Sequence, residues 1–424
     1  MYSLVVSAAS VFLAAGLYVA GMMMLGTQIS LGLADAGHAA TTVSLVMIQY
    51  SFGFMAGSWL GPRLISRVGH IRVFSAFSSL VCCLALLHGA FLDPWLWGLL
   101  RGLTGFCGAL LLIVLESWIN AHATAATRGR LMGFYMINYY LAGAAGQWLV
   151  GLPDAGDFRA WSLCAGLLVL SSVPLALTSR PAPPLPPAGR LAIRPLLAAS
   201  RISVVGACAA GFALASFYQL APVHLHQLGA DTGTISRYMA LAVLASMLLQ
   251  LPVGRLADRY DRRRVILGLA LAIAVSALGV AIFGGLSQTL LFAASMLFLG
   301  VTSCLYPTCL ARLHDRTQGQ GQSHVGANAT LLLCYGVGQC LGPLSTALLM
   351  TLSGPAGLYL GIALVLLIYA LYAGHRLRVA DTAVAEQKKF VAVSPSTPVL
   401  AQLDPRAEPA PPPTAPGQDR LSTP

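Results

Sequence analysis

Charged residues are scarce in this chain. Asp, Glu, Lys and Arg together make up 9% of its 424 residues, whereas a soluble domain carries about 25%. Hydrophobic residues make up 57%. Because so few side chains can face water, the composition excludes a soluble globular domain and predicts an integral membrane protein.

The sequence also lacks the patterns that hold metals, phosphates or acyl groups. It contains no Cys-x-x-Cys, no His-x-x-x-His, no nucleophile elbow and no phosphate-binding loop. All nine cysteines fall inside apolar segments, where no disulfide framework is expected. His224 and His226 fit an interfacial position better than a ligand pair. We therefore expect no enzyme activity, no metal site and no cofactor.

Twelve apolar stretches are long enough to cross a membrane. A helix needs about 20 apolar residues to span the hydrocarbon core. The stretches lie at 4–27, 42–62, 73–92, 95–118, 130–151, 159–179, 202–222, 237–254, 265–284, 288–311, 326–350 and 354–375. The first is too long for a signal-peptide core and has no basic region before it, so we expect it to remain as a helix. The pattern predicts an all-α membrane protein with twelve transmembrane helices.

The net charge of +11 is distributed unevenly. Of the 25 Lys and Arg residues, 22 lie on one side of the expected topology: sixteen in the loops after every second segment and six in the C-terminal tail. The exceptions are Arg101, Arg159 and Arg237. By the positive-inside rule, the basic loops and both termini are cytoplasmic. Charge that follows membrane topology in this way argues against a nucleic-acid partner. The loops on the other side carry Asp35, Asp93, Asp154, Asp157 and Asp231.

Two regions interrupt the series of apolar segments. Residues 180–201 hold four arginines around a proline-rich run, which predicts an extended linker. From about 377 the apolar runs end, and nine of the 24 prolines lie between 395 and 424, which predicts a disordered tail. The expected units are a six-helix half at 1–179, a cytoplasmic linker at 180–201, a second six-helix half at 202–376 and a cytoplasmic tail at 377–424.

One loop carries a specific motif. The string GRLADRYDRRR, Gly254 to Arg264, resembles the loop signature of the major facilitator superfamily of membrane transporters and departs from it at Asp261, where the family has glycine. A worn copy, PRLISRVGHIR, Pro62 to Arg72, stands 192 residues earlier. Two copies in corresponding places imply two homologous six-helix bundles related by pseudo-symmetry, as in this superfamily.

Further segments resemble one branch of that superfamily, the uncharacterised bacterial YcaD-like group. They are ESWINAHATAATRGRL from Glu116, YMINYY from Tyr135, the Gly146–Gln147 pair, LYP from Leu305 and NATLLLCYGVGQCLGP from Asn328. The resemblance runs through most of residues 1–376. It implies the fold and a transport role, and it names no substrate.

The resemblance implies that the charged loops act as gates. In the superfamily, the acid of the signature caps the start of a helix in the other half, a favourable place for negative charge. Carried over, Asp258 would face Arg128 to Arg130 at the start of segment 130–151. Arg259 or Arg262 would reach Asp315, just after segment 288–311.

The earlier copy offers a weaker gate. Ser66 stands where the signature has its acid, so it can cap a helix only as a neutral hydroxyl. Arg67 would pair with Glu116. The two gates would then be unequal in strength. The alternative is that these charges only set the topology.

Two charges lie well inside a segment, Arg101 and Glu116, both in 95–118. Fifteen residues at about 1.5 Å each separate them by roughly 22 Å along one helix, so they cannot pair. Arg101 lies at cavity depth, and RGLTG, Arg101 to Gly105, resembles an element of proton-coupled exporters. The alternative is that Arg101 reaches the outer headgroups. Glu116 lies near the cytoplasmic end and suits a gate better than a proton carrier.

We expect the substrate cavity between the halves near the middle of the membrane. Polar and aromatic side chains there supply hydrogen bonds and stacking without fixed charge. Such a cavity suits a neutral, weakly polar or amphipathic compound, with Arg101 able to take an anion. Part of the set would instead join helices to one another. The candidates besides Arg101 are Tyr18, Gln49, Tyr50, Asn138, Tyr139, Thr302, Tyr306, Tyr335 and Gln339.

These features predict a monomeric secondary transporter in the bilayer of the bacterial inner membrane that moves a small organic solute by alternating access. Efflux is favoured, because the element at Arg101 and the Gly342–Pro343 pair are similar to features of exporters. Coupling to protons stays open, since the first segment lacks the acid that exporters often have. Uptake of a small metabolite is the alternative. An alternative of another class is a sensor with a transporter fold that binds a solute without moving it.

Overall fold

The computed structural model describes residues 2–121, 123–124, 127–152, 157–178, 193–285, 287–317, 324–378 and 390–391. Within these residues the chain forms thirteen α-helices and no β-strand. The helices are α1 (Tyr2–Asp35), α2 (Ala40–Val68), α3 (His70–Ala90), α4 (Pro94–Ala121), α5 (Arg128–Leu149), α6 (Phe158–Leu170), α7 (Ser172–Ala176), α8 (Ile193–Gln227), α9 (Thr232–Arg259), α10 (Arg262–Phe283), α11 (Gln288–Thr317), α12 (His324–Ser353) and α13 (Gly357–Arg378). The all-α prediction is confirmed.

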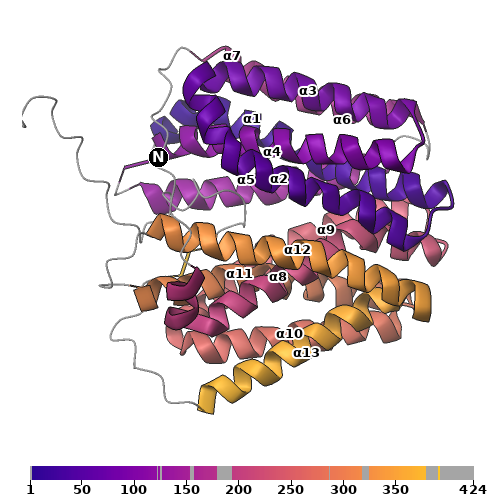
Figure 1. Ribbon diagram of the computed structural model, residues 1–424, viewed down its shortest axis with the longest axis vertical. Coiled ribbons are helices and arrows are strands. Elements are labelled where there is room, and N and C mark those ends of the chain that lie inside the picture. The colour runs from indigo at the N-terminus through magenta and orange to yellow at the C-terminus, as the bar shows by residue number, and fades with distance from the viewer. Residues whose placement is uncertain are drawn as a thin grey trace, which may run out of the picture.

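The helices form two bundles that lie side by side (Figure 1). Helices α1 to α7 make up the first half and α8 to α13 the second. The halves meet where α5 packs on α9, α2 on α12 and α1 on α8. Each half therefore contributes three helices to the seam between them, and that seam is where a site shared by both halves can form.

Eleven spans in the described part of the chain are long and apolar enough to cross a membrane. Helices α6 and α7 form one of them, Phe158–Ala176, which is interrupted at Ser171 shortly before Pro174. The remaining long helix, α5, carries Asn138 and Gln147 as well as arginines in its first turn, which lower its hydropathy. The twelve expected segments correspond to the eleven spans and α5.

Two helix boundaries differ from the sequence expectation. Helix α1 continues to Asp35, well past residue 27. Helix α8 begins at Ile193, inside the expected linker, and is broken by the non-helical Ser200 (φ −156°, ψ 88°) before it continues. Residues 193–199 include two leucines and two alanines, which are good helix formers. Residues 179–192, and all of 379–424 except Phe390 and Val391, lie outside the described residues.

Acidic residues begin three helices at one end of the molecule. Asp93 accepts a hydrogen bond from the Leu96 amide at 2.7 Å at the start of α4. Asp157 caps α6 and Asp231 caps α9 in the same way. Hydrogen bonds from the Thr234 hydroxyl and amide hold the pKa of Asp231 below its ordinary value. These acids, which the sequence marks only by their side of the membrane, therefore also satisfy free amides at helix starts.

The two copies of the loop motif turn by different means. In the first, Gly69 takes φ +96° and donates its amide to the Ile65 carbonyl at 2.8 Å, so the chain passes from α2 to α3 in one residue. In the second, Asp261 takes φ −54° and accepts from the Arg263 amide at 2.9 Å, capping α10. The aspartate thus needs no left-handed backbone, which explains how this copy departs from the family's glycine.

Glycines let two helix pairs approach closely. Gly57 on α2 packs on α4, where an added Cβ would stand 2.8 Å from the Ala109 Cβ. Gly338 on α12 packs on α8, where an added Cβ would stand 2.8 Å from the Phe212 amide. These two pairs form the tightest helix contacts of each half.

Candidate functional site

Tyrosines from both halves gather at the seam. Tyr18 on α1 donates its hydroxyl to a carbonyl of α4 at 3.1 Å. The Tyr50 hydroxyl of α2 lies beside the same residue. In the second half, Tyr306 on α11 and Tyr335 on α12 pack edge to face, with ring centroids 5.2 Å apart. Tyr139 on α5 lies within electrostatic reach of Tyr50 and Tyr335. The structure therefore brings five sequence-predicted site residues together.

Arg101 lies beside this cluster on α4 and is 7% exposed. Its guanidinium carbon stands 4.6 Å from the centroid of the Tyr50 ring, a cation–π distance worth about 2 kcal/mol when desolvated. Its Nε and Nη1 are buried without a hydrogen-bond partner. Gly26, which has no side chain, faces Nη2. A buried charge without a counter-ion costs several kcal/mol, so the ring alone does not compensate this one.

Other predicted cavity residues satisfy their polar groups within the bundle. Asn138 donates to the Phe12 carbonyl at 3.1 Å and ties α5 to α1. Gln49 and Thr302 each donate to a carbonyl one turn back on their own helix, at 3.3 Å and 2.6 Å. Gln339 lies within reach of Tyr335 on α12. Gln339 is therefore placed beside the tyrosine cluster.

One polar contact across the seam escaped the sequence reasoning. Gln250 on α9 donates to the Tyr140 hydroxyl on α5. Tyr218 on α8 lies near Tyr139 and Tyr140. Gln250 is the only side-chain amide in segment 237–254, and that isolation in an apolar run is the signal that marks it.

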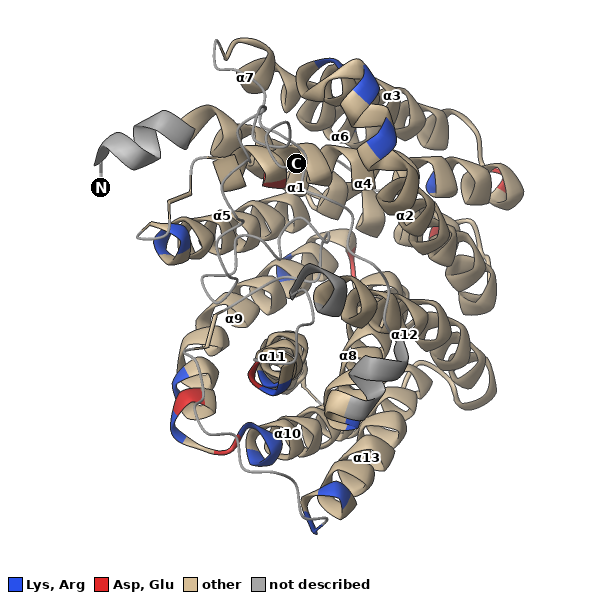
Figure 2. Ribbon diagram, turned by 60° about the vertical axis from the view of Figure 1, so that its left-hand side comes forward, with Lys and Arg blue, Asp and Glu red and all other residues tan. Residues whose placement is uncertain are grey.

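Basic residues lie at the ends of α2, α5, α9, α10, α11 and α13 that face the viewer in Figure 2. We name this the basic end and the other the opposite end. Here Arg262 is buried, pairs with Asp315 and donates to the Ala311 carbonyl at 3.3 Å. The expected contact of Arg262 with Asp315 is present, whereas Arg259 is exposed. The Arg262–Asp315 pair ties the start of α10 to the end of α11.

Asp261 forms a second set of contacts at the basic end. Its carboxylate lies 2.8 Å from Arg263 Nη2 and 4.0 Å from Arg312 Nη1. Burial raises the pKa of Asp261, but the hydrogen bonds from Arg263 lower it more, so the pKa lies below its ordinary value. This loop of the second half is therefore held by several charged contacts.

The contact expected between Asp258 and the start of α5 is not made. The Asp258 carboxylate instead accepts a hydrogen bond from the Phe390 amide at 2.6 Å, and Arg262 Nη2 lies 3.6 Å away. Arg128, at the start of α5, has a buried Nε without a partner. Among the described residues, the Asp258 carboxylate therefore contacts the tail and its own half, and not the first half.

The contacts expected of the first-half loop are also not made. Ser66 donates to the Arg63 carbonyl at 2.8 Å, within its own helix, so it caps no other helix. No ion pair joins Arg67 to Glu116, because Arg67 is exposed whereas Glu116 is fully buried. Glu116 lies within electrostatic reach of Tyr135 on α5.

Two polar contacts join the halves at the opposite end. Ser30 on α1 donates to the Gln219 carbonyl on α8 at 2.9 Å. Further along both helices, His226 Nε2 lies 2.9 Å from Asp35 Oδ1. Both contacts hold α1 against α8 at this end.

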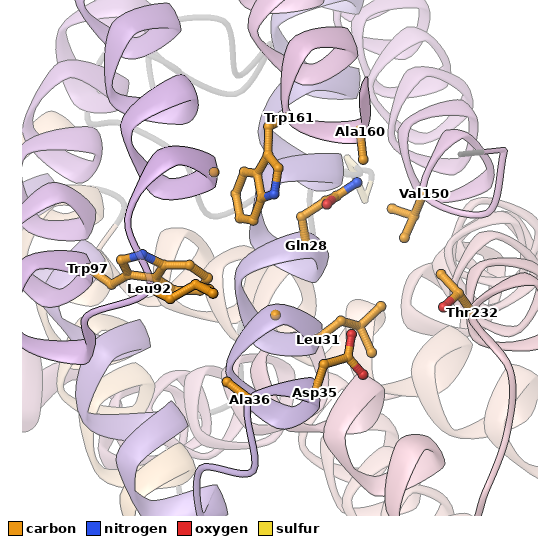
Figure 3. Close-up of a pocket in the computed structure, with 12 residues that line it drawn as sticks. Gln28, Leu31, Asp35, Ala36, Leu92, Trp97, Val150, Ala160, Trp161 and Thr232 are labelled. Carbon is orange, nitrogen blue, oxygen red and sulfur yellow. The ribbon is translucent and has the colours of Figure 1, made fainter. Parts of the chain in front are cut away.

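A cavity of about 280 Å³ lies at the same end. In Figure 3 the rings of Trp97 and Trp161 border it on one side, with Asp35 and Thr232 across from them. The two indoles pack edge to face, with centroids 5.6 Å apart. None of the predicted substrate-binding residues lines this cavity, so it is separate from the cluster around Arg101.

Comparison with known proteins decides the family. The sequence profile of the Major Facilitator Superfamily matches residues 11–321 and 204–413. The chain belongs to the major facilitator superfamily. It is 30% identical over 350 residues to the uncharacterized MFS-type transporter YcaD of Salmonella arizonae, covering 82% of this chain and 90% of that protein. It is also 30% identical over 358 residues to YcaD of Escherichia coli O45:K1, covering 83% and 92%.

Solved structures of the superfamily share the fold. The nucleoside transporter NupG aligns with a TM-score of 0.70 at 14% identity, covering 88% of this chain and 98% of its own. A bacterial homologue of the lysosomal transporter Spinster, described as inward-facing and occupied, aligns at 0.70 and 14%, covering 89% and 97%. A D-xylose-proton symporter aligns at 0.62 and 15%, covering 86% and 96%. The chain is a multi-pass membrane transporter of the bacterial MFS type.

Proposed function

We propose that this MFS transporter moves a small organic solute by alternating access, and that Arg101 binds an acceptor group of the solute. The observation that carries the proposal is the buried guanidinium, two of whose nitrogens have no hydrogen-bond partner, beside tyrosines of both halves. A buried donor without a partner loses the free energy of a hydrogen bond. A solute that supplies the acceptor would recover it.

The chemistry of the cluster favours an organic monoanion with a flat or apolar body. A guanidinium binds carboxylate or phosphate through two parallel hydrogen bonds. Tyrosine rings offer stacking surfaces, and their hydroxyls offer hydrogen bonds. The alternative solute is neutral and amphipathic, since two structural neighbours are by name a nucleoside transporter and a D-xylose-proton symporter.

Charge and contacts support an orientation and a conformation for this transporter. By the positive-inside rule the basic end is cytoplasmic, with both termini and the linker on that side of the inner membrane. The halves touch at the opposite end through Ser30 and Asp35. We therefore propose that the conformation is inward-open, in a protein that works as a monomer.

Efflux is the proposed direction, because Arg101 and Gly105 on α4 resemble an element that exporters carry on this helix. Uptake is the second candidate, since nothing in the site's chemistry fixes a direction. Proton coupling has a weaker basis. Glu116 is fully buried near the basic end, whereas a coupling group must be accessible from both sides in turn.

A ligand screen by thermal shift on the purified protein tests the proposal. A solute present at 100 times its Kd stabilises the folded carrier by about 2.7 kcal/mol. We expect aromatic carboxylates or phosphates to raise the Tm of the wild type and to leave Arg101→Ala unshifted. Arg159→Ala removes an exposed pair with Asp157 and serves as the matched control. An equal shift in Arg101→Ala would remove Arg101 from the site.

Flux in proteoliposomes then separates transporter from sensor. The solute found in the screen is loaded inside, and its exchange for labelled solute outside is followed. Exchange that depends on Arg101 supports transport. Binding without exchange would favour the sensor.

A further inference from the structure

A short piece of the C-terminal tail lies against the basic end of α9. Phe390 and Val391 are half-buried and pack on the hydrophobic core, although α13 ends at Arg378. The Phe390 amide donates to Asp258 Oδ1 at 2.6 Å. The Phe390 ring lies on Gly254, where an added Cβ would stand 2.6 Å from its Cδ1. Two residues on one face of α9, one turn apart, thus hold the same tail residue.

Both contact residues belong to the loop motif. Gly254 is its first residue, and Asp258 is its acid. The missing side chain at 254 leaves room for an aromatic ring. The carboxylate at 258 accepts a backbone amide, an interaction that needs no particular tail side chain beyond the ring.

Phe390 engages the Asp258 carboxylate, which is the group expected to help close the basic end. Helix α5 of the other half begins without a side-chain cap, since Thr127 makes no capping bond and the first turn holds no acid. A carboxylate is favourable at such a helix start. Asp258 is the acid that the loop motif would supply there, and its Oδ1 accepts the Phe390 amide instead.

We propose that Phe390 and Val391 form an autoinhibitory strap, which docks on Gly254 and Asp258 and holds the basic end open. The proposal rests on the proposed function only for alternating access, not for any solute. Docking and closure compete for one carboxylate and one helix face, so closure requires the strap to leave. The strap therefore shifts the population toward the open conformer by the free energy of its own docking.

Distances between spin labels on the two halves measure this competition without a substrate. Labels at Arg72 on α3 and His375 on α13 are exposed and lie near the basic end of each half. They are attached through a ketone-bearing amino acid, so that the nine native cysteines stay in place. The protein is measured in nanodiscs as the full chain, truncated after Arg378, truncated after residue 400, and as Phe390→Ser and Gly254→Ala.

We expect a population at shorter distance to grow at least several-fold when the chain ends at Arg378. Phe390→Ser should reproduce that change, and Gly254→Ala should too, because its Cβ displaces the ring. The chain that ends at residue 400 keeps Phe390 and should match the full chain. Identical distributions in the full chain and the chain ending at Arg378 would overturn the proposal. So would an equal change in both truncations.

A peptide of residues 384–396 tests docking by itself. We expect the labelled peptide to bind the protein truncated after Arg378, measured by fluorescence anisotropy, and to restore the longer distance. A peptide carrying Phe390→Ser should bind at least tenfold more weakly. Equal binding of both peptides would overturn the strap. These readouts need no transported solute, so they can fail or succeed independently of the solute proposal.

Discussion

Arg101 is the residue whose surroundings demand the most explanation. It is buried, its closest described partner is the face of the Tyr50 ring, and Nε and Nη1 donate to nothing. At 7% exposure the side chain is enclosed by the protein, which favours the proposed binding role over the alternative that it reaches the outer headgroups. A bundle held by helix packing gains nothing from such a charge, and binding of a solute would give the charge a role.

Substitutions at Arg101 separate function from structure. Arg101→Ala should abolish transport while the Tm stays equal or rises, because a costly buried charge is removed. Arg101→Lys should keep the charge and still lose most of the activity, since a lysine lacks the planar fork. Flux and melting temperature are measured for both variants. Near-wild-type flux in Arg101→Lys would contradict a binding role.

Gly69 is the residue whose backbone cannot accept a side chain. Its φ of +96° and ψ of 152° fall in a region that is essentially restricted to glycine. Gly69→Ala should therefore destabilise the fold by about 1–3 kcal/mol, seen as a lower Tm. Gly133→Ala on α5 is the control, because no atom lies within 4 Å of its added Cβ. Equal melting temperatures of the two variants would show that the backbone at residue 69 accepts a side chain without strain.

At the scale of elements, the close pairing of α2 with α4 depends on bare backbone. A Cβ on Gly53 would collide with the Gly102 carbonyl oxygen and stand 2.9 Å from the Phe106 amide. Backbone atoms cannot rotate away as side chains can, so the helices must separate.

We expect Gly53→Ala to destabilise the protein by about 1–3 kcal/mol, as overpacking does. The comparison is Gly166→Ala on α6, where the added Cβ meets nothing within 4 Å. Thermal melting of both variants in the same detergent is the measurement. A Gly53→Ala variant that melts with Gly166→Ala would show that α2 and α4 can move apart without loss.

Elements were more predictable from sequence than contacts. Apolar run length depends only on the neighbouring residues and the membrane thickness, so the twelve segments could be located, with errors at α1 and α8. The pairing of Gln250 with Tyr140 depends on how two distant helices face each other, which no local pattern encodes. The contact of Asp258 with Phe390 depends in addition on the conformational state, so the motif alone could not reveal it.

At the scale of the whole molecule, we expect the two loop motifs to act as gates of unequal strength. Asp258 is a charged acceptor at the basic end, whereas the Ser66 hydroxyl is engaged within its own helix. Asp258→Asn keeps an oxygen for the Phe390 amide but loses the charge that favours a helix start. Gate closure should weaken about two- to fivefold, from a charge–dipole term of 0.3–1 kcal/mol. Ser66→Ala should change little. Equal flux in the two variants at matched expression would contradict unequal gates.

The orientation in the membrane is open to a direct test. The basic end should be cytoplasmic, because 22 of the 25 Lys and Arg residues belong to the loops and the tail expected on that side of the membrane. Reporter fusions after Pro187 and after Pro424 should both be active only as cytoplasmic reporters. Activity of a periplasmic reporter at either site would reverse or break the topology.

Helix α5 is bound to α1 by its own polar side chains. Asn138 donates to the Phe12 carbonyl, and Gln147 accepts from the Thr27 hydroxyl at 2.8 Å. These groups are costly when they face lipid alone, and they keep α5 below the apolarity of the other spans. We therefore expect α5 to enter the bilayer together with α1, a helix whose contact residue was made 126 residues earlier, rather than by itself. Insertion of the first half would then be a cooperative step in its biogenesis.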